Sequence, residues 1–543
     1  MRKFILAAAA ALLCACRSDA QPLPAGPPKL LVVISVDQFS ASLFDEYRPK
    51  FTGGLARLAG GTVFSNGFQS HAATETCPGH STILTGDHPA RTGIVGNIWI
   101  DQTIGRSDKT IYCAEDESQP GSSSIDYKVS SRHLLVPTLG ELMKARWPAS
   151  RSVAVAGKDR AAVMMTGRNV DQRWYWTGKT FDTDLATASL PLTVARARMA
   201  IAAALTQPQP PLEPPPYCQT KAREVAVTGG GRPVGTGRLG RAAGDASALR
   251  ASPELDGDTL AIALGLVDEM QLGRRVDPDL LAISLSATDY VGHTYGTEGE
   301  EMCLQLLELD REIGDFLKLL DSRGIDYAVA LTADHGGKDI PERERLAGVA
   351  SAARVDPALS PATMGKKLVA QFGLSGPGLL GDSPFGDMYV DKNLKPADRN
   401  RLLAAAVAAY KAHPQVEAVF TATQIARTAL PTGDPEKWTL IERARASYHS
   451  GRSGDFLVML KKDITPIADT SRYVATHGSP WDYDRRVPIL FWRPDAAGAA
   501  VEHSADTTDI MPTLASMIGL ELAPESVDGH CLADVAFASC KPR

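Results

Sequence analysis

The segment KLLVVISVD, residues 29–37, indicates the fold of this chain. Residues 30–36 are aliphatic apart from one serine, and the run ends at the charged residue Asp37. A strand without alternating polar residues is typical of a parallel sheet that is covered by helices on both faces. The segment therefore predicts a buried strand with a carboxylate at its carboxyl end.

The same arrangement recurs along the chain. Apolar runs that lead directly into polar residues stand at 152–156, 280–285 and 327–331, and a further core strand is predicted at 487–492. Helical patterns alternate with these runs, at 138–146, 298–323 and 509–518. Alternating strands and helices predict an α/β fold with a mainly parallel central sheet flanked by helices. Ligands of such sheets bind beyond the carboxyl ends of the strands.

Two segments interrupt the alternation. Residues 168–256 are rich in glycine and proline and are interpreted as a loop-rich insertion, whereas residues 340–475 have the pattern of a small α+β cap. We therefore predict one catalytic domain, residues 28–543, with two insertions. Gly235, Gly237 and Gly240 match G-x-G-x-x-G, but a dinucleotide site needs this motif between a core strand and a helix. The motif is interpreted as a flexible loop.

The N-terminus has the pattern of a secretory signal peptide, predicted to span residues 1–20. Arg2 and Lys3 precede an apolar run from Phe4 to about Ala15. No later run approaches the roughly 20 apolar residues of a transmembrane helix. We expect export to the periplasm or the medium. Residues 13–16 loosely match a bacterial lipobox, so an outer-membrane lipoprotein with a lipid anchor at Cys16 is the less favoured alternative.

Six cysteines remain after the predicted signal peptide: Cys77, Cys113, Cys218, Cys303, Cys531 and Cys540. An even number in an exported protein predicts disulfides, although fifteen pairings are open in principle. Short loops favour Cys531 with Cys540 and Cys77 with Cys113, which leaves Cys218 with Cys303.

The charge balance argues against a nucleic-acid partner. Lysine and arginine number 57 against 63 aspartate and glutamate, a net charge of −6. Proteins that bind nucleic acids usually carry a basic excess.

Chemistry-bearing residues follow the predicted core strands. Four of them stand at strand ends: Asp37, Asp289, Asp334 and His335. His293 follows Asp289 by four residues, and His477 precedes the last core strand. Carboxylates and imidazoles are favoured zinc ligands, so these residues predict a metal site. The remaining histidines are interpreted as structural: His71, His80, His88, His133, His413, His449, His503 and His530.

The stretch ATETCPGHSTILTG, residues 73–86, contains the predicted nucleophile. Pro78 suits the first turn of a helix, which places Thr76 just before the helix N-terminus, where unpaired N–H groups and the positive end of the helix dipole attract a phosphate. Coordination to zinc would turn a threonine hydroxyl into an alkoxide. The cysteine nucleophile of sulfatases needs C-x-P-x-R, which Cys77 lacks, and Ser81 has no G-x-S-x-G elbow.

These motifs, in this order, resemble the alkaline phosphatase superfamily: Asp37, TETCPGH, DYVGH at 289–293, ADHG at 333–336 and THG at 476–478. The resemblance is strongest to the branch shared by nucleotide pyrophosphatase/phosphodiesterases and the phosphate-irrepressible, threonine-dependent alkaline phosphatases. It implies one zinc bound by Asp37, Thr76, Asp334 and His335. It implies a second zinc bound by Asp289, His293 and His477. No catalytic magnesium is expected, and the sequence does not predict structural calcium.

Three further residues bear on the substrate. Lys158 and Arg160 follow the strand at 152–156, where they can bind phosphate oxygens. With Asn97 they are similar to the phosphate-contacting set of the monoesterases in this branch. The resemblance implies an exported zinc-dependent alkaline phosphatase that hydrolyses phosphate monoesters through a phosphothreonine. A phosphodiesterase or nucleotide pyrophosphatase on the same two-zinc site is the alternative. A noncatalytic metal-dependent binding lipoprotein is less compatible with an intact Thr76.

Overall fold

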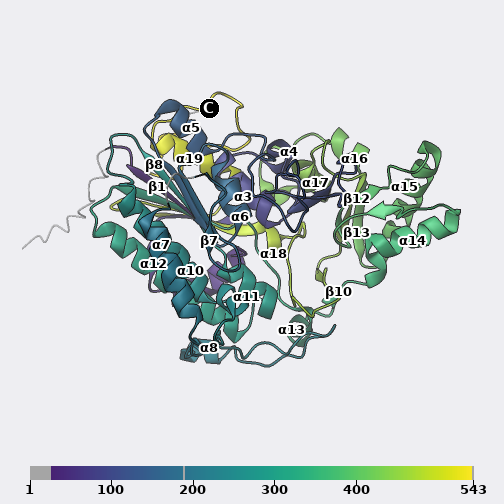
Figure 1. Cartoon of the computed structure of the whole chain (residues 1–543), viewed down its shortest axis with the longest axis horizontal. Coiled ribbons are helices and arrows are strands. Elements are labelled where there is room, and N and C mark those ends of the chain that lie inside the picture. The colour runs from purple at the N-terminus through teal and green to yellow at the C-terminus, as the bar shows by residue number, and fades with distance from the viewer. Residues whose placement is uncertain (1–25, 187–189, 541–543) are drawn as a thin grey trace, which may run out of the picture.

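The computed structural model describes residues 26–186 and 190–540 (Figure 1). Ten strands of this part of the chain form one sheet, in the order β17-β2-β16-β9-β1-β8-β5-β6-β7, with β18 beside β2. Its five central parallel strands are β9 (Tyr327–Thr332), β1 (Leu30–Val36), β8 (Asp279–Leu285), β5 (Ser152–Ala156) and β6 (Gln172–Trp176). The predicted α/β class with a mainly parallel sheet is confirmed.

Strand β1 shows why the central strands are aliphatic. All seven of its residues are buried, and its side chains alternate between two hydrophobic cores, one on each face of the sheet. Leu30, Val32, Ile34 and Val36 face one core, and the side chains between them face the other. A strand covered on both faces tolerates few polar residues.

Helices cover both faces of the sheet (Figure 1). One face is covered by α1 (Ala41–Tyr47), α2 (Gly54–Leu58), α7 (Leu192–Leu205), α10 (Pro253–Glu269), α11 (Ala287–Tyr295) and α12 (Glu300–Asp321). The other is covered by α3 (Thr76–Thr85), α5 (Leu139–Arg146), α6 (Asp159–Thr166) and α19 (Ile510–Met517). Short helices in the connections are α4 (Pro89–Thr92), α13 (Pro341–Leu346) and α18 (Asp482–Arg485).

The edges of the sheet contain strands that depart from the parallel pattern. The predicted core strand near residue 487 is β16 (Arg486–Trp492), which runs antiparallel to both β9 and β2 (Thr62–Phe68). The sequence did not predict β2, whose segment TVFSNGF includes asparagine and glycine. The short strands β17 (Ala499–Val501) and β18 (Ala505–Asp506) pair with β2.

The first predicted insertion contains more regular structure than expected. Strand β6 and the antiparallel β7 (Phe181–Asp182) extend the central sheet, and α7 packs on it. The interpretation of residues 168–256 as loop-rich is wrong for this part. The strand was missed because it contains Arg173, which is buried through its ion pair with Asp184. The rest of this segment contains two short helices, α8 (Pro216–Gln219) and α9 (Ala246–Arg250).

The second predicted insertion contains a separate four-stranded antiparallel sheet with its own core (Figure 1). Its strands, in order, are β11 (Leu379–Leu380), β12 (Gly386–Val390), β14 (Phe456–Leu460) and β13 (Val416–Thr421). The helices around it are α14 (Pro361–Phe372), α15 (Pro396–Lys411), α16 (Ala422–Arg427) and α17 (Leu440–Ser447). Strands β10 (Ala353–Arg354) and β15 (Ile464–Thr465) pair at its base. We call this unit the cap; that it is an insertion stays a prediction.

In the described part of the chain, no helix has the length and apolar character needed to cross a membrane. The predicted signal peptide at residues 1–20 and the alternative lipid anchor at Cys16 lie outside the described residues.

The structure contains three disulfides with the expected pairing: Cys77–Cys113, Cys218–Cys303 and Cys531–Cys540. The first links α3 to the segment after the hairpin of β3 (Ile98–Ile100) and β4 (Thr110–Tyr112).

Loop length predicts unequal contributions of these disulfides to stability. Cys77–Cys113 spans 36 residues and Cys531–Cys540 spans 9. Chain entropy gives about 4 and about 2.5 kcal/mol respectively. Urea unfolding should therefore show a larger loss of unfolding free energy in the C77A/C113A variant than in the C531A/C540A variant. Equal losses of unfolding free energy in the two variants would contradict loop closure as the source of the stabilisation.

Candidate active site

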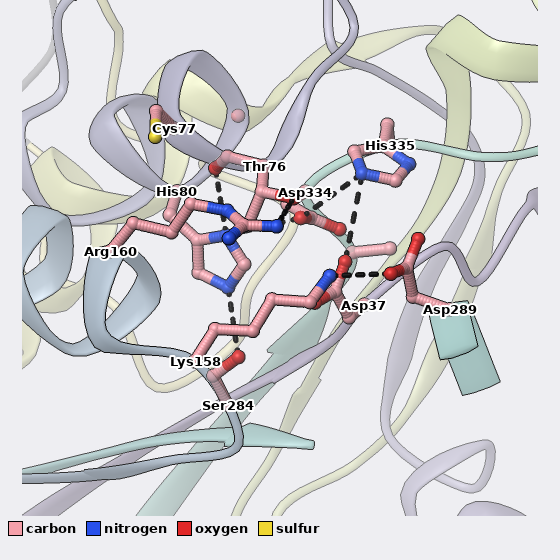
Figure 2. Close-up of polar contacts among 12 residues, drawn as sticks. Asp37, Thr76, Cys77, His80, Lys158, Arg160, Ser284, Asp289, Asp334 and His335 are labelled. Carbon is pink, nitrogen blue, oxygen red and sulfur yellow. Dashed lines mark hydrogen bonds and ion pairs between the residues drawn. The ribbon is translucent and has the colours of Figure 1, made fainter. Parts of the chain in front are cut away.

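Three aspartates meet at the carboxyl edge of the central sheet (Figure 2). Asp37 directly follows β1, Asp289 lies in the first turn of α11 after β8, and Asp334 follows β9 by two residues. The register aligns these ends, with Val36 opposite Leu285. All three aspartates are at most 2% exposed. The parallel sheet thus brings together residues separated by hundreds of positions.

Three histidines surround these carboxylates. His293 Nε2 lies 3.2 Å and His477 Nε2 3.4 Å from the same oxygen, Oδ1 of Asp289. His335 Nε2 lies 3.3 Å from Asp334 Oδ2 and 3.6 Å from Asp37 Oδ1. The structure therefore gathers all six carboxylate and imidazole residues that the sequence analysis named as metal ligands.

The second ring nitrogens fix the orientation of these histidines. The Nδ1 atoms of His293, His335 and His477 each lie 2.8 Å from a backbone carbonyl oxygen, of Ala475, Gly336 and Thr74 respectively. When Nδ1 carries the ring proton and donates it to the carbonyl oxygen, Nε2 carries a lone pair, and this lone pair faces the carboxylates. This arrangement is typical of metal-binding histidines.

The carboxylates carry more negative charge than the buried cation beside them neutralises. Lys158 Nζ lies 2.6 Å from Asp37 Oδ2 and 2.5 Å from Asp289 Oδ2. Burial and the neighbouring charge of Asp334 raise the pKa of Asp37 well above its usual value. Burial also opposes ionisation of Asp289, but His293 and Lys158 outweigh it and hold the pKa of Asp289 well below its usual value. Buried carboxylates in such excess need further cations.

Burial also keeps His335 in the neutral form that binds metals. It lowers the pKa of this imidazole to about 3, although the charge of Asp334 acts in the opposite direction. Burial opposes ionisation of Asp334, but its contacts with the His335 and His80 rings outweigh burial and lower the pKa of Asp334.

The donor atoms fit divalent metal ions. Apart from their ion pairs, five buried atoms of the cluster have no hydrogen-bond partner: Asp37 Oδ1 and Oδ2, Asp289 Oδ1, Asp334 Oδ2 and His335 Nε2. Two groups have ligand atoms within 4.8 Å of one another, Asp289 with His293 and His477, and Asp37 with Asp289 and His335. Asp289 belongs to both groups, and Asp334 adjoins the second through His335. Carboxylate and imidazole donors in such sets suit zinc.

Thr76 is the first residue of α3 and is buried beside this cluster. The helix approaches Asp334 closely, because a β-carbon on Gly79 would lie 1.9 Å from the Asp334 carbonyl oxygen. Only glycine permits this contact, which places the N-terminal end of α3 against the loop that carries Asp334. The positive end of the helix dipole at this N-terminus attracts an anion.

Lys158 and Arg160 reach the site from the end of β5 and the start of α6. Arg160 Nη2 donates to the Thr76 hydroxyl oxygen at 3.4 Å (Figure 2). The Nε atom of Arg160 is buried without a hydrogen-bond partner, so it remains available to an acceptor. A guanidinium beside a hydroxyl at a helix N-terminus suits the binding of phosphate oxygens.

Asn97 is held at the site by Glu75, which the sequence analysis passed over. The backbone N–H of Asn97 donates to Glu75 Oε2 at 2.6 Å, and Asn97 Oδ1 accepts from the backbone N–H of Cys77 at 2.8 Å. The carbonyl side of the amide is thereby engaged, and its NH₂ group is left to donate. Burial raises the pKa of Glu75, although the N–H of Asn97 opposes this shift.

His80 was interpreted as structural, but it contacts the site. Its Nδ1 lies 3.1 Å from Asp334 Oδ2 and 2.9 Å from the Thr76 carbonyl oxygen, and its Nε2 lies 3.0 Å from Ser284 Oγ (Figure 2). His80 is thus a positioning residue for Asp334. The available signal was its spacing, one helical turn after Thr76.

The alternative nucleophiles and the glycine-rich motif considered in the sequence analysis are engaged in other contacts. Cys77 is bonded to Cys113, and the buried Ser81 hydroxyl donates to the Pro78 carbonyl at 2.7 Å. In the glycine-rich motif, the N–H groups of Gly235 and Gly237 both donate to Glu301 Oε1 at 2.8 Å. A carboxylate already fills the place that an anionic ligand would need.

Comparisons with known proteins identify relatives of this chain over most of its length. A family model described as type I phosphodiesterase / nucleotide pyrophosphatase matches residues 31–480. Alkaline phosphatase PhoK from Sphingomonas sp. is 52% identical over 95% of this chain and 93% of its own. Alkaline phosphatase PhoD from Zymomonas mobilis is 47% identical over 95% of this chain and 90% of its own. The crystal structure of alkaline phosphatase PafA shares the fold, with a TM-score of 0.81 at 24% identity, covering 95% of this chain and 100% of that one.

Proposed function

The chain belongs to the type I phosphodiesterase / nucleotide pyrophosphatase family, and within that family we propose that it acts as a zinc-dependent alkaline phosphatase on phosphate monoesters. The observation that carries the proposal is the position of the Thr76 hydroxyl, between a buried carboxylate–imidazole cluster and Arg160. The names of the two relatives at 52% and 47% identity support the activity.

Two zinc ions are proposed as the cofactors. Asp37, Thr76, Asp334 and His335 would hold one, and Asp289, His293 and His477 the other. When bound, the ions would lower the pKa of the threonine hydroxyl and neutralise charge on the attacking and leaving oxygens. The excess of buried carboxylates supports such cations.

The side chains of the site would then have separate roles in the reaction. Arg160, Lys158 and the Asn97 amide bind the phosphate oxygens, and the N-terminal end of α3 adds the positive end of its helix dipole. Thr76 Oγ1, after losing its proton, attacks phosphorus in line, which forms phosphothreonine and breaks the bond to the alcohol. The alcohol takes up a proton from water. A second water then attacks phosphorus, which releases inorganic phosphate and restores Thr76.

A phosphodiesterase is the second candidate, favoured by the name of the family model and by the present contacts of Lys158. Its ammonium is paired with Asp37 and Asp289. A monoester dianion offers one more charged oxygen than a diester, so basic side chains at the phosphate favour monoesters. Metal ions on the carboxylates would release Lys158 toward the substrate.

The K158A/R160A variant should separate these candidates. We expect kcat/KM to fall by about two to four decades for a phenyl phosphate and by less than tenfold for its bis-phenyl analogue, because charge-assisted contacts are worth about 1.5–3 kcal/mol each. Lys144→Ala is the control, since this lysine pairs with Asp171 at 3.0 Å away from the site. Equal losses on the two substrates would remove the assigned role of the basic pair.

Export to the periplasm or medium is also proposed. Three disulfides support it, since disulfides persist in oxidising compartments. Sequencing the N-terminus of the protein recovered from the producing cells should show cleavage near Ala20. An intact Met1 would argue against a cleaved signal peptide.

A further inference from the structure

A pocket lies between the cap and the central domain, directly beside the proposed catalytic residues. It is lined by Glu75, which precedes Thr76, and by Gly478, which follows His477. The segment at 95–100 and the cap residues Ser383 to Tyr389 form further walls. The pocket therefore adjoins both the nucleophile and the metal group of Asp289, His293 and His477. The alcohol part of a phosphate ester would occupy a position of this kind.

Aromatic side chains form much of the pocket wall. Trp99, Phe385, Tyr389 and Tyr448 all line it. Phe385 brings the cap against the site, because a β-carbon on Gly478 would lie 3.1 Å from its ring atom Cζ. Ring faces attract cations as well as apolar groups.

The charged residues of the pocket all have the same sign. Its lining includes three carboxylates, Glu75, Asp382 and Asp387, and no lysine, arginine or histidine among the described residues. Asp387 is half-buried, and burial raises the pKa of its carboxyl to about 7. A positive charge placed beside it would favour the ionised form.

We propose that this pocket binds the alcohol part of the substrate and selects phosphate monoesters whose alcohol carries an ammonium group. The inference rests on the proposed function and extends it to a substrate class. Carboxylates and aromatic rings together attract an ammonium group. An alcohol that carries its own carboxylate would meet three like charges, which disfavours its binding.

Two substrates of similar shape test the proposal, 2-aminoethyl phosphate and propyl phosphate. They differ by an ammonium in place of a methyl group, and any difference in intrinsic reactivity cancels when one substrate is compared between variants. Asp387→Asn should lower kcat/KM for 2-aminoethyl phosphate by about threefold to tenfold and leave propyl phosphate within about twofold. Asp382→Asn should act in the same direction; because Asp382 is exposed, this variant guards against misfolding. Asp315→Asn, an exposed position on α12 outside the pocket, is the control and should change neither value.

The outcomes distinguish an error in the pocket assignment from an error in the proposed phosphatase function. If propyl phosphate is hydrolysed in a Thr76-dependent reaction but neither pocket variant changes the preference for the ammonium substrate, the pocket assignment is wrong and the phosphatase proposal stands. If the wild-type protein hydrolyses neither substrate nor a phenyl phosphate, the phosphatase proposal fails, and the pocket assignment fails with it.

Discussion

Replacing Thr76 by alanine should lower kcat for phosphate monoesters by at least about four decades. Loss of a catalytic nucleophile removes the covalent route altogether, and comparable losses in other hydrolases reach about six decades. The substitution removes one hydroxyl and one methyl group at the start of α3, and the Cys77–Cys113 disulfide and Gly79 contacts that hold this helix remain. The zinc content of the variant should change little, since six other side chains surround the proposed ions.

Thr76→Ser is the matched control, because it keeps a hydroxyl at the same position. We expect it to retain activity within about two decades of the wild type. Acid quenching of the wild-type protein during turnover of ³²P-labelled substrate should trap label on Thr76, and the alanine variant should trap none. An alanine variant that still releases phosphate at a wild-type rate would refute the nucleophile.

Replacing Asp289 by asparagine should remove bound metal and lower kcat/KM by about three decades, since metal ions contribute several kcal/mol to such transition states. Asp289 belongs to both ligand groups, and its Oδ1 lies near His293 and His477 while its Oδ2 contacts Lys158. An asparagine keeps the shape but loses the charge that attracts the ions. Elemental analysis after dialysis should find about two zinc ions per wild-type chain and fewer in the variant.

Asp279→Asn provides a matched control at the opposite end of β8, the strand that leads to Asp289. Asp279 is buried at the amino end of β8, where its carboxylate accepts from the backbone N–H groups of Arg151 and Gly273 at 2.8 and 2.9 Å. Its replacement should reduce stability but leave the zinc content unchanged. Equal metal content in both variants would contradict the assignment of Asp289 as a ligand.

The local pattern of the sequence predicted the central strands and the polar residues at their ends. This succeeded because a strand buried on both faces is mostly aliphatic, as β1 is at every position but Ser35. It failed for β2, which contains Asn66 and Gly67, and for β6, where Arg173 is buried only through its ion pair with Asp184. Such strands are stabilised by partners that are distant in sequence.

The sequence by itself determined the α/β class and the candidate residues Thr76, Asp37 and Asp289. For the six cysteines it favoured one of fifteen possible pairings, and this pairing is the one in the structure. Hydrophobic periodicity and strand-end position are properties of neighbouring residues, so they can be read along the chain. Only the tertiary structure decided which of these side chains share a ligand group, that His80 and Glu75 hold the site in place, and that carboxylates line the pocket beside it. These features depend on distances between segments far apart in the chain, which are fixed by how the helices and the cap pack on the sheet.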